Sequence, residues 1–376
     1  MGRGSTQILI RKIIECLAEG SKSITEISEK TGLDRTAIGK YVNILKESGI
    51  LIEDQEGTSK RFTLVPTFRT DTYFGLPLDE NAEKQMSSLY HLIKKKWQTK
   101  TQRKLLNTHA QKIAYKVIVS CNLKIPCGWY IYGGIGLMSY NDDKEYNYYG
   151  LPKEVENSVD TIATEYAENL YAYQSKNKLY EEFSKELYLL KEDILKILYS
   201  PKFDEHPKNS LFVMNRKLRR LISLAPKDDR ENYRKILDAY QDLMLDVTNK
   251  LDEKGILTHK REITLLFETL WRYIALFNFK QDLRQFYSEQ ILNKHFYLDV
   301  MQQEDEIIDI ATQLQEIIPE QILEDSIKKK LYDALAQIKL LSPEEQQEQK
   351  KKLQKLKKEL GEEKFQQWLF EQTGLK

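Results

Sequence analysis

The clearest hydrophobic pattern lies near the start of the chain. From Ile24 to Ser48, apolar residues recur at helical spacing, first in a short run and then in a longer one. Gly32 separates the runs and is expected to end the first helix, because glycine adopts positive φ at little cost. Asp34 stands where the N-cap of the next helix belongs. An earlier apolar run over residues 6–19 predicts a further helix, so three helices are expected in succession.

Beyond Gly49 the period of the pattern changes. Two short stretches, the apolar Ile50–Ile52 and the mixed Lys60–Val65, flank a polar tip and predict a β-hairpin. Three helices followed by a hairpin is the element order of a winged helix-turn-helix domain. Residues 66–78 hold two prolines and a glycine and predict a linker.

The spacing within this region points to a family. Residues from Thr25 to Leu51 follow the pattern T-E-I-S-x-x-T-G-L-x-x-T-x-I-x-K-Y-V-x-x-L-x-x-S-G-I-L. This pattern resembles the winged helix-turn-helix repressors of the arsenic-repressor and multiple-antibiotic-resistance-repressor type, over about the first 68 residues. The resemblance implies that the second helix of the motif enters the major groove of DNA. The residues on its groove-facing side are Arg35, Thr36, Lys40, Tyr41 and Asn43.

The residue types suit DNA recognition. Arg35 can form a bidentate contact with guanine, and Asn43 with adenine. Lys60 and Arg61 in the hairpin are expected to contact phosphate, which positions a domain without reading sequence. The alternative is a winged helix that binds protein. Residues 1–68 carry ten Lys/Arg against nine acids, and such a neutral domain is a weak electrostatic footprint for DNA.

A second region stands out by its charge. Residues 84–124 follow a predicted N-cap at Asp79 and contain ten Lys/Arg and no acid. A helical surface of this kind suits the DNA backbone, because each neutralised phosphate releases counterions. The candidate contacts are Lys94, Lys95, Lys96, Lys100, Arg103 and Lys104. The alternative is a solvated face whose charge is neutralised by acidic helices downstream.

Aromatic residues and glycines are concentrated in residues 125–140. Aromatic rings can stack on bases, and the candidates are Trp129, Tyr130, Tyr132 and Tyr140. Three glycines resemble a fragment of a phosphate loop, although no complete motif is present: Gly133, Gly134 and Gly136. The simpler alternative is a short buried β-turn between helical regions. Residues 80–140 can also form a second, divergent winged helix with 125–140 as its hairpin.

The remainder of the chain predicts helices, so the fold class is mainly α. Helical patterns cover 152–174, 178–199, 228–254 and 259–280, with a break at 200–209. The acidic run 299–325 still has a buried face, and the tail ends in a predicted docking patch around Phe365, Trp368 and Leu369. We divide the chain into a winged domain (1–68), a basic helical segment with an aromatic hairpin (69–150), a helical bundle (151–342) and a C-terminal surface helix (343–376).

Composition excludes several classes of protein. The net charge of the 376 residues is +1, so any basic surface is local. Cys16 lies on an apolar helix face and is expected in the core, whereas Cys121 and Cys127 have no zinc spacing. The five histidines are scattered, and neither GxSxG nor GxxxxGK[ST] occurs. We therefore expect no metal, no cofactor and no enzymatic activity. The absence of an apolar span or signal core indicates a cytoplasmic protein.

The function predicted from these features is sequence-specific binding of double-stranded DNA by a transcriptional regulator acting as a homodimer. The helical C-terminal region would dimerise, receive a signal or contact a protein partner. The alternative is a non-enzymatic scaffold component of a nucleic-acid machine for replication, partition or mobile-element defence, with the winged helix used for docking. A third hypothesis, a Mg²⁺-dependent nuclease, would use carboxylates of the acidic helices.

Overall fold

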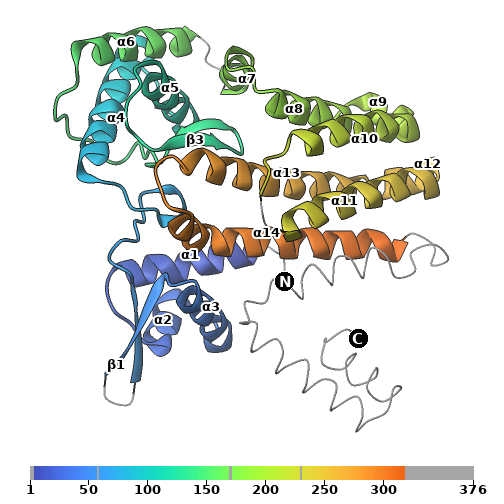
Figure 1. Cartoon of the computed structure of the whole chain (residues 1–376), viewed down its shortest axis with the longest axis horizontal. Coiled ribbons are helices and arrows are strands. Elements are labelled where there is room, and N and C mark those ends of the chain that lie inside the picture. The colour runs from blue at the N-terminus through green and yellow to red at the C-terminus, as the bar shows by residue number, and fades with distance from the viewer. Residues whose placement is uncertain (1–3, 57–58, 169–171, 229–230, 318–376) are drawn as a thin grey trace. The chain divides into compact units, whose positions relative to one another are not determined.

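The computed structural model is mainly helical (Figure 1). It describes residues 4–56, 59–168, 172–228 and 231–317. The chain divides into two compact units, the larger made of Met1–Asp228 and Tyr240–Glu320 and the smaller of Asp229–Ala239 and Gln321–Lys376. The structure describes residues 231–239 of the smaller unit, and both candidate sites lie in the larger one.

The first five elements form the predicted winged helix-turn-helix domain. They are α1 (Gly4–Ala18), α2 (Ile24–Thr31), α3 (Arg35–Glu47), β1 (Leu51–Glu56) and β2 (Ser59–Leu64). The two strands pair antiparallel with Leu51 opposite Leu64, which makes the wing. In Figure 1 these elements are the blue part of the chain.

Capping residues fix the turn between α2 and α3. Ser23 and Glu26 form a capping box, in which each side chain accepts a hydrogen bond from the backbone amide of the other. Gly32 ends α2 in the left-handed conformation, with φ of 70°. Asp34 Oδ1 accepts from the amides of Thr36 and of the next residue, at 2.9 and 3.1 Å. The predicted roles of Gly32 and Asp34 are confirmed.

The apolar stripes of the three helices meet in one core. Its buried members are Ile13, Cys16, Leu17, Ile27, Ile38, Val42, Leu45, Ile50, Leu51, Phe62 and Leu298. Cys16 is a core residue, as predicted. Leu298 belongs to α14 (Glu289–Ile317), so the core of the winged domain is completed by a helix from a distant part of the sequence.

The segment after the wing, which the sequence predicts as a linker, is packed against its neighbours, and the domain boundary at this segment stays a prediction. It contains a short 3₁₀ helix, η1 (Tyr73–Gly75), in which Phe74 has a left-handed backbone with φ of 59°. The Phe74 ring stacks on Phe296 of α14, with ring centroids 4.2 Å apart. The segment therefore holds its position by aromatic contacts.

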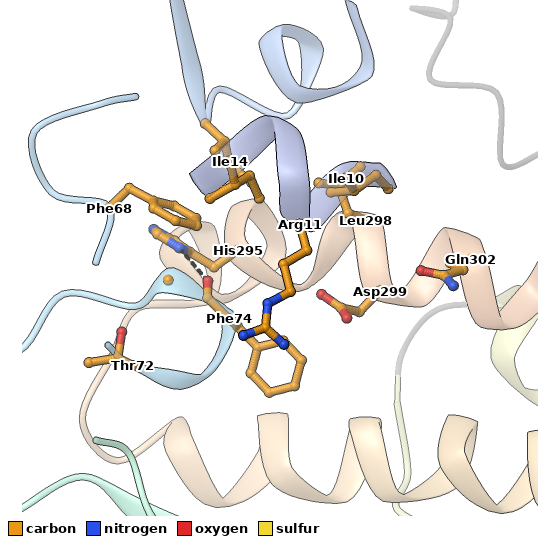
Figure 2. Close-up of a pocket in the computed structure, with 12 residues that line it drawn as sticks. Ile10, Arg11, Ile14, Phe68, Thr72, Phe74, His295, Leu298, Asp299 and Gln302 are labelled. Atoms are coloured by element: carbon orange, nitrogen blue, oxygen red, sulfur yellow. Dashed lines mark hydrogen bonds between the residues drawn. The ribbon is translucent and has the colours of Figure 1, made fainter. Parts of the chain in front are cut away.

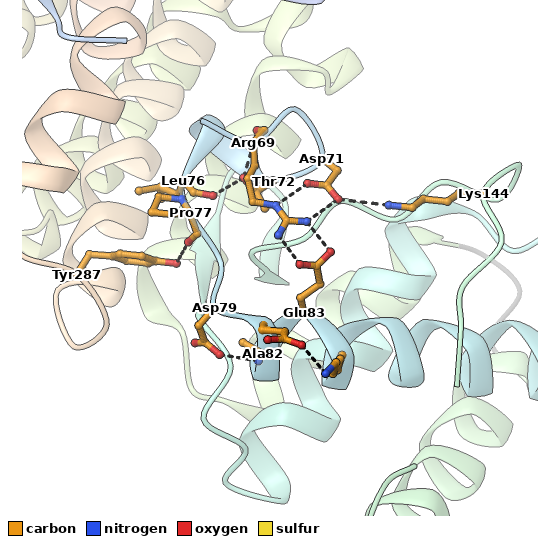
Figure 3. A network of polar contacts seen from close by, with 12 residues as sticks. Arg69, Asp71, Thr72, Leu76, Pro77, Asp79, Ala82, Glu83, Lys144 and Tyr287 are labelled. Carbon is orange, nitrogen blue, oxygen red and sulfur yellow. Dashed lines mark hydrogen bonds and ion pairs between the residues drawn. The ribbon is translucent and has the colours of Figure 1, made fainter. Parts of the chain in front are cut away.

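An ion-pair network also braces this segment (Figure 3). The Arg69 guanidinium donates to Asp71 at 3.0 Å and to Glu83 of the following helix at 2.6 Å. Lys144 lies 3.3 Å from the same Asp71 carboxylate. Hydrogen bonding to Arg69 lowers the pKa of Glu83. Burial alone would raise the pKa of Asp71, but the guanidinium lowers it. We call Arg69, Asp71, Glu83 and Lys144 the hinge network.

The next elements are two helices and a second hairpin. They are α4 (Glu80–Thr101), α5 (Asn107–Ser120), β3 (Cys127–Tyr130) and β4 (Gly133–Gly136). Asp79 caps α4 by accepting from the Ala82 amide at 2.8 Å, as predicted. The strands pair antiparallel, with Cys127 opposite Gly136. A hairpin is therefore present within 125–140, and a second winged helix stays a prediction.

The remaining described elements are helices. They are α6 (Lys153–Glu168), α7 (Ala172–Glu182), α8 (Glu186–Leu198), α9 (Pro201–Glu205), α10 (Pro207–Leu224), α11 (Glu231–Lys250), α12 (Glu253–Thr258), α13 (Lys260–Leu283) and α14. The apolar helix predicted over 259–280 is confirmed as core, since Leu266, Leu270 and Ile274 of α13 are fully buried. No helix in the described part of the chain is long and apolar enough to cross a membrane.

Boundaries in this region differ from the predicted ones. The two helices expected over 152–174 and 178–199 are replaced by three, α6 to α8. One break falls at Ser184, whose φ of 50° is not helical. The predicted break at 200–209 contains the short α9. The predictions for residues 343–376, including the docking patch, lie outside the described residues.

Candidate nucleic-acid interface

Helix α3 presents a polar face to solvent. Arg35, Thr36, Lys40 and Asn43 are exposed, while Ile38, Val42 and Leu45 on the opposite face are fully buried. Within the described residues, no ion pair or hydrogen bond engages the side chains of Arg35 and Asn43. Four of the five side chains predicted to face DNA therefore lie on one accessible face.

The other flank of α3 faces α14. Tyr41 is half-buried and lines a crevice of about 190 Å³ together with Lys40 and the α14 residues Asp305 and Asp309. Lys40 Nζ lies 5.8 Å from the centre of the Tyr41 ring. Burial and the neighbouring Asp309 raise the pKa of Asp305, and Lys40 lowers it. Carboxylates thus border one side of the recognition helix, and base reading by Tyr41 stays a prediction that its placement does not favour.

Lys60 in the wing is paired but accessible. Its Nζ lies 2.6 Å from Glu53, which also pairs with Lys46 at 2.5 Å. Hydrogen bonds from these two lysines lower the pKa of Glu53. The Lys60 side chain is still 64% exposed, so it can exchange Glu53 for a phosphate.

Arg61 is held within the domain. It donates to the Ser21 carbonyl oxygen at 2.7 Å and to Glu26 at 3.2 Å, and most of its side chain is covered. This guanidinium braces the hairpin against the start of α2. Its predicted contact with phosphate is untested, and the sequence pattern did not indicate the bracing role.

Cations of the acid-free stretch pair with acids that follow it in the sequence. Lys96 lies 2.7 Å from Asp160, and Lys104 lies 3.3 Å from Asp143. Lys94 donates to the Asp142 carbonyl oxygen at 2.5 Å. Three of the six candidate contacts in this stretch are therefore engaged by the segment that the sequence shows to be acidic.

The other three candidates remain on the surface. Lys95, Lys100 and Arg103 are exposed, and no ion pair with another described residue engages them. Lys95 borders a surface groove with Gln98 and Tyr148. Lys104, although paired, is still 63% exposed. Four of the six candidate cations are therefore accessible to a polyanion, and three of them have no ion pair with a described residue.

Lys112 of α5 lies fully inside the protein. Its side chain belongs to the largest fully buried ones, with 1% exposure. Burial, and to a smaller extent the charges of Lys176 and Lys191, lowers its pKa to about 7. A cation of the basic stretch is therefore part of the core.

The aromatic hairpin is largely interior. Trp129 and Tyr140 are 1% and 3% exposed, so the hypothesis that these rings stack on bases is wrong for the folded protein. Trp129 packs edge-on against Tyr115 and donates its indole N–H to the Tyr115 hydroxyl at 2.5 Å. Tyr130 is half-buried. Tyr132 at the turn is 64% exposed and stays accessible.

The hairpin glycines serve close packing. A Cβ added to Gly134 would collide with the Tyr115 ring, and one added to Gly136 would meet Met86. Protein side chains fill the space where a phosphate loop would hold its ligand, so that reading of the glycines is wrong. Among the described residues no three His, Cys, Asp or Glu side chains gather as a metal ion would require.

Comparison with known proteins identifies one segment. Residues 11–53 match the family model described as bacterial regulatory protein, arsR family. The match covers α1 to α3 and the start of β1, in agreement with the winged helix-turn-helix seen here. A helix-turn-helix domain of this family suggests a DNA-binding transcription regulator. No curated protein and no solved structure matches the chain.

Proposed function

We propose that this protein is a cytoplasmic, sequence-specific regulator of transcription that binds double-stranded DNA as a homodimer. The observation that carries the proposal is the exposed start of α3, with Arg35 and Thr36, inside a segment that matches the arsR family. In this fold the N-terminal residues of the second motif helix meet base edges. The five N–H donors of arginine fit the two acceptors that guanine shows in the major groove.

The homodimer is part of the same proposal. One winged helix reads a half-site, and two copies related by a two-fold axis read a palindrome with half-sites one helical turn, about 34–36 Å, apart. Support for a protein contact in the helical region comes from α10, which exposes Phe212 and Val213 side by side. Large apolar and aromatic side chains of this kind are enriched at interfaces.

The test is selection from random double-stranded DNA by the purified full-length chain over a series of salt concentrations. We expect salt-sensitive binding and enrichment of a palindromic site, because phosphate contacts release counterions and a dimer reads two half-sites. Mass photometry of the complex gives its stoichiometry. Binding without an enriched sequence contradicts the regulator proposal.

A scaffold role is the second candidate. It is favoured by the carboxylates of α14 beside α3 and by the paired lysines of α4, which both reduce the attraction for a polyanion. Absence of DNA binding at low salt would support this candidate, with the winged helix as a protein-docking module. In either case we propose binding without catalysis, which Mg²⁺-dependent cleavage of the DNA probe would contradict.

A further inference from the structure

A pocket of about 350 Å³ lies between the winged domain and α14 (Figure 2). Ile10 and Ile14 of α1 form one wall, Phe68 and Phe74 of the connecting segment form a second, and Leu298 of α14 contributes to a third. This volume is within the range of small-molecule sites, which are mostly apolar with a few polar groups. The site is separate from the exposed face of α3.

The aromatic wall is held in one arrangement. His295 Nδ1 is hydrogen-bonded to the Phe74 carbonyl oxygen at 3.0 Å, and its ring lies parallel to Phe68 with centroids 6.1 Å apart. Phe74 adopts a left-handed backbone, which is unfavourable for a bulky residue and persists only where packing enforces it. Gly75 follows with φ of 66°, and the Phe68 ring occupies the place where a Cβ would lie, so only glycine fits at this position. The pocket is therefore built by specific packing.

Asp299 is the acidic group of this pocket. Its carboxylate lies among the lining side chains in Figure 2, and no side chain of the described residues forms an ion pair or hydrogen bond with it. Arg11 of α1, the cation that lines this pocket, has a carboxylate of its own and pairs with Glu15 at 2.8 Å.

The buried position of Asp299 affects the ionisation of its carboxyl group. Burial raises the pKa of Asp299 to about 7, since the apolar surroundings disfavour the charged form. The titratable groups facing it are Arg11 from α1 and His295 from α14, which line the pocket, and Tyr130 from β3, whose pKa the Asp299 charge raises. Burial lowers the pKa of His295, so this ring does not supply a positive charge near neutral pH.

We propose that this pocket binds a small amphipathic cation, with an apolar or aromatic body against Phe68, Phe74 and the isoleucines and a protonated amine on the Asp299 carboxylate. The ligand supplies an ionic partner for Asp299, because the Arg11 guanidinium at the same pocket is paired with Glu15. Because ion pairing needs the ionised carboxylate, binding releases the Asp299 proton and strengthens with pH. For a pKa of about 7, affinity is expected to rise about tenfold between pH 6 and pH 8.

The position of the pocket links it to DNA binding, a step that rests on the proposed function. Ile10, Leu298 and Gln302 line both this pocket and the crevice beside Lys40 and Tyr41 of α3. A ligand between α1 and α14 therefore changes the contact that places the acidic α14 beside the recognition helix. We expect it to change DNA affinity in the full-length protein.

The experiment is calorimetric titration of the full-length chain with phenethylamine, which stays protonated from pH 6 to pH 8, and with the neutral analogue 2-phenylethanol. We expect the amine to bind about tenfold more tightly at pH 8, and the preference to disappear in Asp299→Asn. Asp309→Asn, on the same helix but outside this pocket, is the matched control and should retain the preference. Equal binding of the two compounds, or an amine preference that survives Asp299→Asn, overturns the proposal.

A second variant guards against misfolding of the first. Ile10→Phe places a larger ring at the pocket wall and is expected to weaken binding of both compounds at least several-fold. Fluorescence anisotropy of a DNA probe, with and without the amine, separates the two proposals. Amine binding by a protein that binds no DNA overturns the proposed function and supports the pocket. DNA binding without amine binding overturns the pocket alone.

Discussion

Helices α3 and α4 both carry basic side chains on a solvent-facing side, but their surroundings differ. Arg35 of α3 stands at the start of its helix without an ion pair to any other described residue. On α4, Lys96 lies 2.7 Å from Asp160, and Lys94 is held by the Asp142 carbonyl oxygen. Arg35 is therefore better placed to contact a nucleic acid than the paired lysines of α4, whereas Lys95 and Lys100 of α4 stay exposed and unpaired among the described residues.

The difference shows that the number of cations in a stretch of sequence does not measure the charge of the folded surface. A polyanion responds to the charge that remains after folding has placed acids beside the cations. In the stretch from Lys84 to Lys124 those acids come from outside the window, so the count of ten cations overstates the basic surface. The three predictions below test this contrast by removing, in turn, a buried cation, exposed cations without an ion pair, and a paired cation.

The largest effect is expected at Lys112, the fully buried cation of the basic stretch. Its pKa is lowered to about 7 in the folded protein, against about 10.5 in the unfolded chain. Between these values the unfolded state holds the extra proton, so this residue's destabilising effect is complete below pH 7 and fades as pH rises to 10.5. Lys112→Met should raise the free energy of unfolding by on the order of 4 kcal/mol at pH 6.5.

Urea unfolding at pH 6.5, 8 and 9.5 measures this prediction. The free energy of unfolding should also rise less steeply with pH in the variant, and the difference in slope should correspond to about one bound proton. Lys95→Met, an exposed lysine on α4, is the matched control and should change neither quantity. Destabilisation of Lys112→Met at pH 6.5 would show that the buried amine makes a favourable contact, contrary to this account. DNA affinity should be unchanged in Lys112→Met, whereas Lys95→Met should weaken binding modestly for every sequence, because Lys95 lies on the exposed basic surface.

An intermediate effect is expected at the DNA surface. Arg35→Ala should weaken binding to the selected site by roughly 5- to 150-fold, equivalent to about 1–3 kcal/mol, and relax the sequence preference at one position. Arg103→Ala on the exposed basic surface should weaken binding less than Arg35→Ala does. The loss should be similar for every sequence, because phosphate contacts carry no sequence information. Fluorescence anisotropy with the selected and a scrambled duplex compares them. Equal losses on both duplexes for Arg35→Ala would remove it from base reading.

The smallest effect is expected at the paired lysines. Lys96→Ala removes a half-exposed ion pair with Asp160, and such pairs contribute about 0.2–1 kcal/mol. Thermal unfolding should therefore shift little, and DNA affinity should fall less than for Arg103→Ala because Lys96 is already neutralised. A larger loss of DNA affinity at Lys96 than at Arg103 would mean that DNA displaces Asp160, and would restore the basic stretch as an interface.

The winged domain could be predicted in detail because its signals are local. Gly32, Asp34 and the apolar spacing of α3 act within a few residues of one another, and each was found in its predicted role. Helices of the remainder were also predictable as a class. The exact ends of these helices were less predictable, because a residue such as Ser184 can adopt a left-handed backbone where the sequence has no glycine.

The sites were less predictable because they depend on residues far apart in the chain. Lys96 meets Asp160, and Phe74 meets His295 and Phe296, across long separations that no sequence window covers. The sequence shows that α14 is acidic, but it does not show that α14 lies beside α3. Asp299 looked like one acid among many until the apolar residues around it were known.

For the proposed homodimer, the hinge network has a consequence for the operators that it can bind. Arg69, Asp71, Glu83 and Lys144 fix the exit of the winged domain to the start of α4. Each base pair inserted between two half-sites moves one of them by about 3.4 Å and turns it by roughly 35°, since a helical turn holds about 10–10.5 base pairs. A flexible connection between the winged domain and α4 would accommodate that change. A connection fixed by ion pairs is strained by it instead. Spacer length in the operator should therefore be strictly fixed, and breaking the network should loosen it.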